Sequence, residues 1–321
     1  MSARECARSS RWFGVGDTTR IAWTDVTWNP VTGCTRVSPG CERCYIDWAP
    51  PFRIEGRHFR DRDGNRSNAI GSTTGVRLHE DRLTWPLRKR SWRGKRVFVC
   101  SLADLFHDAV PDAHIVHVWA VMAATHEWRR EITFQVLTKR PARMRGLLSS
   151  DEFRAAVTAA AAGLMDEDHA DAVYDGIYHH HWPLPNVHVG VTIEDQERAN
   201  LRIPILLDTP TAVRWLSVEP MLGPVDLREW IVAAGHGENT YPLPYFDWVV
   251  VGGESGPGAR AMREEWARSV VGQCRAANVP VFVKQMGTVW ARENGVRGKA
   301  DRIEDLPSDM RIRRFPENPH A

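Results

Sequence analysis

Residues 187–220, with the sequence VHVGVTIEDQERANLRIPILLDTPTAVRWLSVEP, contain a complete strand–helix–strand unit. The segments Val187–Thr192 and Val213–Val218 are short, apolar and rich in β-branched residues, which is typical of strands buried on both faces. The residues between them, up to about Asp208, fit a helix. Strands that alternate with helices in this way form parallel sheets covered by helices. The unit therefore predicts an α/β fold.

The same unit recurs along the chain. Six or seven such units predict a partial or full (β/α) barrel of six to seven mostly parallel strands. A doubly wound open sheet is the alternative, because periodicity does not reveal whether the sheet closes. The other strands are predicted at Ile21–Asn29, Arg96–Ser101, Thr133–Thr138, Trp248–Gly253 and Val279–Lys284, and the other helices at about Asp112–Trp128, Asp151–Leu164, Leu227–Ala234 and Arg263–Ala277.

These elements predict one domain over residues 21–290, with an N-terminal tail at 1–20 and a C-terminal tail at 291–321. An irregular insertion at 46–95 follows the first strand and its loop, and a connection of that length is usually functional. With 321 residues and 43% hydrophobic content, the chain can bury a substantial core. It has no apolar run long enough to cross a bilayer and no stretch resembling a signal peptide. We therefore expect a cytoplasmic protein that makes no membrane contact.

Three of the six cysteines lie within eleven residues, directly after the first predicted strand. Cys34, Cys41 and Cys44 have the spacing C-x6-C-x2-C, and Gly33, Pro39 and Gly40 allow the backbone to curl around a common centre. Disulfides are not expected in an unexported protein. Three clustered thiolates therefore indicate a metal centre.

Two kinds of centre suit three thiolates. A [4Fe-4S] cluster held by three cysteines leaves one iron open. Zinc needs a fourth protein ligand or a water, and a closed structural zinc site would have to recruit a distant residue such as His58 or His107. A third interpretation is that the three thiols bind nothing. Cys100 and Cys274 lie in apolar segments and are interpreted as small core residues.

Polar residues follow nearly every predicted strand. Because the carboxyl ends of parallel strands meet at one edge of a barrel, these residues and the cysteine loop are expected to ring one mouth. Acids, bases and a metal at one mouth predict an active site, although any single member has an alternative role as a helix cap or a surface ion pair. The residues are Asp104, Lys139, Glu194, Glu219, Glu254 and Lys284.

We assign candidate roles within this set. Glu254 lies in a glycine-rich segment, where Gly252 and Gly253 would let a ligand approach backbone N–H groups beside the carboxylate. Glu219 is a second candidate catalytic acid. Glu194 is a candidate ligand-binding residue or, alternatively, the cap of the following helix. The two lysines, Lys139 and Lys284, are candidate catalytic residues that would neutralise a carboxylate or a phosphate.

The net charge of +2 is too small to indicate nucleic-acid binding by itself, but the charge is unevenly distributed. Residues 53–96 contain thirteen Lys and Arg and five Asp and Glu. With Phe59, Trp85 and Trp92 interleaved, this region is a candidate for phosphate contacts and base stacking. The alternative is a solvated insertion whose charges maintain solubility. The run His179–His181 is interpreted as a surface loop rather than a metal site, because adjacent side chains usually point apart.

Eight short motifs occur in order along the chain. They are WNPVTGC (28–34), SPGC (38–41), Cys44-Tyr45, SLADLFH (101–107), VLTKRP (136–141), SVEP (217–220), LGPVD (222–226) and VGGESGPG (251–258). Through these motifs the chain closely resembles, over about Ile21 to Gly287, the three-Cys-motif phage proteins, a domain of unknown function named after two mycobacteriophage gene products.

That family resembles a divergent branch of the radical S-adenosylmethionine enzymes, which place three cysteines after the first strand of a partial (β/α) barrel. The resemblance implies that Cys34, Cys41 and Cys44 hold a [4Fe-4S] cluster whose open iron takes the amino and carboxylate groups of S-adenosylmethionine. Two features depart from that pattern. The usual spacing is C-x3-C-x2-C, and the Gly252-Gly253-Glu254 motif follows about the sixth strand instead of the second. Ser101 and Asp104 are therefore suggested as substitutes in contacting the methionine amino group.

Two classes of function follow. The first is an enzyme in which a reduced cluster cleaves S-adenosylmethionine and the resulting adenosyl radical takes hydrogen from a substrate. The phage association and the Arg-rich insertion favour nucleic acid as the substrate, in modification or repair. The second is a nucleic-acid-binding protein with structural zinc in the cysteine loop. A phage accessory protein that acts with a partner encoded nearby is a further alternative.

Overall fold

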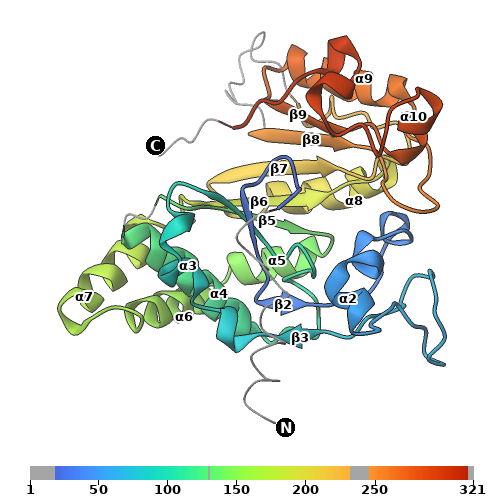
Figure 1. Ribbon diagram of the computed structural model, residues 1–321. Helices are drawn as coiled ribbons and strands as arrows, with labels where there is room; N and C mark the ends of the chain where they lie inside the picture. The colour runs from blue at the N-terminus through green and yellow to red at the C-terminus, as the bar shows by residue number, and fades with distance from the viewer. Residues whose placement is uncertain (1–18, 129–130, 232–245, 317–321) are drawn as a thin grey trace.

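The computed structural model describes residues 19–128, 131–231 and 246–316 (Figure 1). Its centre is a seven-stranded, all-parallel sheet that curls into a half barrel flanked by helices, as the sequence predicted. A separate two-stranded sheet pairs β2 (Val31–Thr32) with β3 (Arg77–Leu78). The strands of the main sheet are β1 (Val26–Trp28), β4 (Arg96–Val99), β5 (Thr133–Thr138), β6 (Val187–Thr192), β7 (Val213–Val218), β8 (Trp248–Gly252) and β9 (Val281–Gln285).

The strand order distinguishes a partial barrel from a doubly wound open sheet. Neighbours in the sheet follow the order β1-β4-β5-β6-β7-β8-β9, which is also their order in the chain. A doubly wound sheet reverses its strand order at a switch point, and the described sheet contains no such reversal. The doubly wound alternative is therefore excluded.

Most of the helices agree with the predictions, which identified α4, α6, α8 and α9 to within a few residues. The helices α5, α7 and α10 were not predicted. The predicted helix at Leu227–Ala234 makes a single turn up to Ile231, and its remainder lies outside the described residues. The helices that flank the sheet are α4 (Asp112–Glu127), α5 (Pro141–Leu148), α6 (Asp151–Ala162), α7 (Glu167–Asp175), α8 (Gln196–Leu207), α9 (Glu264–Ala276) and α10 (Thr288–Glu293).

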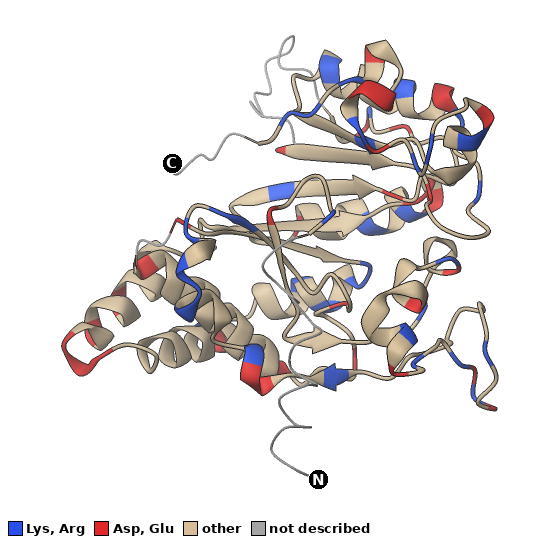
Figure 2. Ribbon diagram, in the orientation of Figure 1, with Lys and Arg blue, Asp and Glu red and all other residues tan. Residues whose placement is uncertain are grey.

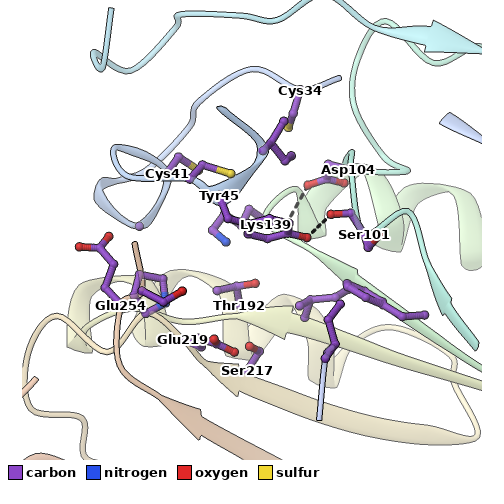
Figure 3. Close-up of a pocket in the computed structure, with 18 of the residues that line it drawn as sticks. Cys34, Cys41, Tyr45, Ser101, Asp104, Lys139, Thr192, Ser217, Glu219 and Glu254 are labelled. Atoms are coloured by element: carbon purple, nitrogen blue, oxygen red, sulfur yellow. Dashed lines mark hydrogen bonds between the residues drawn. The ribbon is translucent and has the colours of Figure 1, made fainter. Parts of the chain in front are cut away.

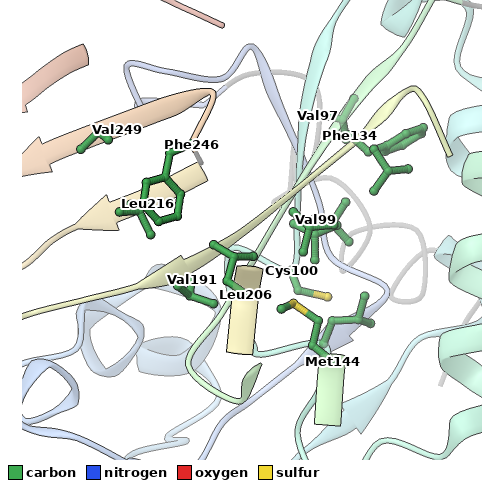
Figure 4. Close-up of a cluster of buried hydrophobic side chains, with 14 of the residues drawn as sticks. Val97, Val99, Cys100, Phe134, Met144, Val191, Leu206, Leu216, Phe246 and Val249 are labelled. Carbon is green, nitrogen blue, oxygen red and sulfur yellow. The ribbon is translucent and has the colours of Figure 1, made fainter. Parts of the chain in front are cut away.

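The outer face of the sheet forms the main hydrophobic core. Alternate strand residues, such as Val99, Val191 and Leu216, point toward the helices and pack against residues such as Met144 and Leu206 (Figure 4). All of these side chains are buried. Successive side chains in a strand point to opposite faces, so the intervening residues must face the inside of the half barrel.

Aromatic rings fill the inner face of the half barrel. The Trp215 ring lies 5.2 Å from the ring of Trp23 and 5.2 Å from that of Trp248. Gly190 on β6 makes room for this layer, because a Cβ atom there would lie 2.6 Å from the Trp215 ring. The layer closes the lower part of the half barrel and leaves the carboxyl ends of the strands for polar residues. We call this layer the aromatic plug; its members are Trp23, Phe98, Trp215, Trp248, Phe282 and Phe315.

The C-terminal segment is part of the domain, so the predicted boundary at 290 is too early. Arg313 forms an antiparallel bridge with Phe282 on β9, and the backbone N–H of Val283 donates to the carbonyl of Ile312. Phe315 packs 5.6 Å from the Trp248 ring. The predicted N-terminal tail lies almost entirely outside the described residues. No described helix is both long and apolar enough to span a membrane.

The insertion contains short helices rather than an irregular chain alone. Two of its aromatic side chains, Phe59 and Trp92, are almost fully buried. Arg36 stacks on the Phe59 ring at 3.7 Å, and Arg57 stacks on the Phe52 ring at 4.5 Å. The prediction that Phe59 and Trp92 stack on bases is therefore wrong. The helical elements are η2 (Tyr45–Trp48), α2 (Pro50–Ile54), η3 (Glu80–Arg82), α3 (Trp85–Arg88) and η4 (Arg90–Trp92).

Charged residues are spread over the whole molecule. Figure 2 shows Lys and Arg interspersed with Asp and Glu on most elements, including the insertion. Several arginines of the insertion remain exposed, among them Arg53, Arg62 and Arg66. Contacts between this region and nucleic acid therefore remain a prediction that rests on charge and on Trp85, which is only partly buried.

Candidate functional site

A cavity of about 360 Å³ opens at the carboxyl edge of the half barrel (Figure 3). The sequence predicted that the strand ends and the cysteine loop would meet here, and the cavity lining contains most of that set. Glu194 and Gly252 do not line the cavity, although they lie directly beside residues that do. The predicted residues that line it are Cys34, Cys41, Cys44, Ser101, Asp104, Lys139, Glu219, Gly253, Glu254 and Lys284.

The cysteine loop is held by backbone geometry and by one buried arginine. Gly33 has a positive φ of 96°, and a Cβ atom there would lie 1.8 Å from the carbonyl oxygen of Gly75. Arg36 is buried and donates to the carbonyl of Cys41 at 2.7 Å and to the hydroxyl of Ser72 at 3.3 Å. The loop is therefore anchored at both ends before any ligand binds.

Two thiols of the loop, those of Cys34 and Cys44, are neutral when nothing is bound to them. Burial raises the pKa of Cys34 to about 12, and only part of this rise is offset by Arg140, whose Nη1 lies 3.8 Å from the Cys34 Sγ. Burial likewise raises the pKa of Cys44 to about 11. A metal centre binds thiolates, so its binding would release these protons. The guanidinium of Arg140 is placed to hydrogen-bond a deprotonated Cys34.

The distances between the three sulfurs bear on whether the loop suits zinc or a [4Fe-4S] cluster. Thiolates on one zinc ion lie about 3.8 Å apart, whereas the three described sulfurs are not all within 4.8 Å of one another. A [4Fe-4S] cluster places each thiolate on a different iron and needs wider spacing. Both histidines proposed as a fourth zinc ligand have other partners, since His58 contacts Asp47 at 3.3 Å and His107 contacts Thr35 at 2.8 Å. The described sulfurs are therefore not arranged as three ligands of a single zinc ion.

Glu194 supports the cysteine loop from below. Its carboxylate is fully buried and accepts hydrogen bonds from Ser38 at 2.7 Å and from Arg202 at 3.1 Å. Gly40 allows this contact, because a Cβ atom at Gly40 would lie 2.4 Å from the Glu194 Cγ. The alternative role of Glu194 as a helix cap is wrong, since Asp195 caps α8 by accepting from the N–H of Arg198.

Asp104 joins the ends of β4 and β5. Its two carboxylate oxygens accept from the hydroxyl of Thr138 at 2.8 Å, the N–H of Lys139 at 3.0 Å and the guanidinium of Arg140 at 3.1 Å. These bonds occupy the carboxylate, so Asp104 positions Arg140 beside Cys34. Ser101 lines the cavity and donates its hydroxyl hydrogen to the side chain of Asn29 at 3.2 Å.

Glu219 and Lys284 form an ion pair in the cavity wall. The Lys284 Nζ lies 2.6 Å from the Glu219 Oε1, and both side chains are largely buried. The amide of Gln285 donates to the same oxygen at 3.2 Å. Thr192 and Ser217 line the cavity beside this pair, and the alternation of β6 and β7 explains their inward direction (Figure 3). This wall offers a carboxylate, an ammonium group and two hydroxyls to a ligand.

Glu254 and Gly253 have partners within the protein. The Glu254 carboxylate accepts from the Arg260 side chain at 2.6 and 2.9 Å. Arg260 also donates to the carbonyl of Pro39 at 2.9 Å, so the pair ties the loop after β8 to the cysteine loop. The N–H of Gly253 donates to Gln285, and a Cβ atom at Gly253 would lie 2.2 Å from the Met286 carbonyl oxygen. The glycines therefore permit close packing of two chain segments.

Residues 18–313 match the family described as "Protein of unknown function (DUF5131)". The chain belongs to this family. No curated protein and no solved structure matches the chain. The matched residues include the C-terminal segment that pairs with β9, in agreement with its place in the domain.

The residues of this DUF5131 member that sequence reasoning missed are mostly arginines whose side chains are fully or partly buried. Arg36, Arg140 and Arg260 each bind a backbone carbonyl of the cysteine loop. Arg140 follows Lys139 directly, so its place after a strand was the one available signal. Nothing in the sequence indicates which distant carbonyl a flexible guanidinium reaches.

Proposed function

We propose that the protein is an iron–sulfur, radical-S-adenosylmethionine-like enzyme. In this proposal Cys34, Cys41 and Cys44 hold a [4Fe-4S] cluster, and S-adenosylmethionine binds in the adjoining cavity. One observation carries the proposal. Three cysteines from a loop after the first strand of a parallel half barrel line the same cavity as the polar ends of the other strands. The cavity volume of about 360 Å³ also lies within the usual range for ligand pockets.

The residues of the chain would bind and shield the reactants. A bound cluster supplies the electron that cleaves S-adenosylmethionine. Arg140 would hydrogen-bond the Cys34 sulfur, while the Glu219–Lys284 pair and the Ser101 hydroxyl would orient polar groups of the ligand. The aromatic plug keeps water from the lower end of the half barrel, which favours chemistry that requires a dry site.

The charges around the cavity support an anionic substrate. The lining contains three carboxylates and more cations, and each carboxylate is already paired, Asp104 with Arg140, Glu219 with Lys284 and Glu254 with Arg260. Among the described residues, Arg20 and Arg43 line the cavity without an ion pair. Nucleic acid, in modification or repair, is the substrate class that fits these cations together with the exposed arginines of the insertion. The cations of the lining are Arg20, Arg43, Lys139, Arg140, Lys284 and Lys299.

Charge reversal at Arg43 tests the substrate class. We expect R43E to weaken binding of a labelled single-stranded oligonucleotide, as measured by fluorescence polarisation. The slope of log Kd against the logarithm of the salt concentration should fall by about one, the value for one lost phosphate contact. R292E on α10 is the matched control, because Arg292 is exposed and does not line the cavity. Equal salt dependence in the wild type and R43E would contradict a nucleic-acid substrate bound at this mouth.

Anaerobic reconstitution tests the enzyme itself. We expect brown protein with about four irons per chain, and 5′-deoxyadenosine on reduction with S-adenosylmethionine. C41A should lose both the colour and the product. C274A is the control, because Cys274 is buried on α9 and away from the cavity. Colourless protein with one tightly held zinc would instead support the nucleic-acid-binding or accessory alternative, in which a partner protein is sought by pull-down.

A further inference from the structure

Two histidines and a glutamate from distant parts of the chain meet on the surface. His126 and Glu127 end α4, and His181 directly follows the π-helical turn η5 (Gly176–His180). One ligand atom from each of the three lies within 4.8 Å of the others. The His181 Nδ1 lies 2.7 Å from the Glu127 Oε1. The His126 and His181 rings lie 4.9 Å apart and are nearly perpendicular.

This cluster is separate from the cavity. In a β/α unit the helix runs back from the carboxyl edge of the sheet to the amino edge, so the end of α4 lies at the edge opposite the cysteine loop. None of the three residues lines the cavity. These three side chains are therefore independent of the proposed iron–sulfur cluster and its substrate.

The three side chains meet at one point. Glu127 and His181 form an ion pair, and a ring nitrogen of His126 lies within 4.8 Å of their ligand atoms. Gly176 lies beside them, and a Cβ atom there would contact the Glu127 Oε2 at 3.5 Å and the His181 Nδ1 at 3.7 Å. Its φ of −55° is ordinary for a helix, so the backbone does not demand glycine. The missing side chain leaves space next to two ligand atoms.

We propose that His126, Glu127 and His181 bind a divalent cation of the zinc class. Two imidazoles and one carboxylate form a known zinc donor set that leaves a fourth position for water. Calcium and magnesium prefer oxygen ligands alone and do not fit this set. The bound ion would link the end of α4 to the turn η5. The other two histidines of the run, His179 and His180, instead face Asp175 at 3.8 and 3.9 Å and are exposed.

Cobalt substitution tests the site on the full-length protein prepared without a histidine tag. After removal of bound metal, the protein should bind one equivalent of Co²⁺ per chain. The bound Co²⁺ should show d–d absorption and no thiolate charge-transfer band. That band would mark cobalt bound at the cysteines. H181A should lose this equivalent, and E127Q should bind it at least about tenfold more weakly. Competition with Zn²⁺ should displace the cobalt from the wild type.

The double variant H179A/H180A is the matched control. It removes two histidines of the same run but leaves the three proposed ligands, so it should keep the equivalent. Far-UV circular dichroism of the metal-free proteins checks that each variant is folded. Retention of the equivalent by H181A, its loss from H179A/H180A, or a wild type with only the thiolate band would each overturn the proposal.

Discussion

Replacing Trp215 by alanine should lower the free energy of unfolding by about 3–5 kcal/mol, the usual cost of removing a fully buried aromatic side chain. The Trp215 ring is completely buried and packs between Trp23 and Trp248. Gly190 lies against its face and offers no side chain to fill the resulting space. The cavity left by the substitution would therefore stay open instead of collapsing. Urea denaturation of the wild type and the variant measures the difference.

The control is W48A, which removes the same side chain from an exposed position. Trp48 is 53% exposed on η2, so its loss should change the stability by no more than about 0.5 kcal/mol. A cost below about 1 kcal/mol for W215A would contradict tight packing of the aromatic plug.

Replacing Arg260 by alanine should also have a large effect, because it removes the ion-pair partner of the Glu254 carboxylate and leaves it the backbone N–H of residue 260 at 2.8 Å. That side chain is 5% exposed, and Arg260 forms two hydrogen bonds to it. Removing one partner of a buried ion pair costs about 3–5 kcal/mol. Here we expect about 2–3 kcal/mol, because solvent reaches part of the guanidinium and screens the pair. The variant also loses the bond to Pro39, so the cysteine loop should hold its metal less tightly.

Two variants test whether the loss of stability comes from the unpaired Glu254 carboxylate or simply from the loss of an arginine charge. R268A removes an arginine that pairs with exposed carboxylates of Glu264 and Asp309, and it should cost less than about 1 kcal/mol. The double variant R260A/E254Q should be more stable than R260A alone, since it no longer buries an unpaired charge. If E254Q restored nothing, the stranded carboxylate would not be the cause. Urea denaturation and iron retention are the two measurements.

The bounds of the central strands could be predicted closely because these strands are buried on both faces of the sheet. The strands β5, β6 and β7 were predicted to the residue, since parallel strands buried on both faces appear as short, mostly apolar runs. Their parallel direction then predicted that the following polar residues would share one edge. The helices α5 and α7 were missed for local reasons. Pro141 begins α5 but was not recognised as a helix start, although proline is favoured at the first position of a helix. The helix α7 has few buried residues to produce a periodic pattern.

The side-chain partners in the site could not be predicted. Glu254 was correctly placed near the cavity, but its bond to Arg260 depends on how two loops approach each other. The same holds for Glu194, whose neighbour Ser38 is 156 positions away in the chain. Sequence spacing predicts which edge of the sheet a residue occupies. It does not predict which long side chain from another loop will reach that residue.

The antiparallel bridge between Phe282 and Arg313 has a consequence for self-association. An uncovered outermost strand offers its backbone groups to any other polypeptide and can template aggregation. On the β9 side, the last part of the chain occupies those groups and anchors itself through the Trp248 indole, which donates to the carbonyl of Arg314 at 2.9 Å. The protein thus shields a vulnerable margin of its sheet with its own C-terminal residues.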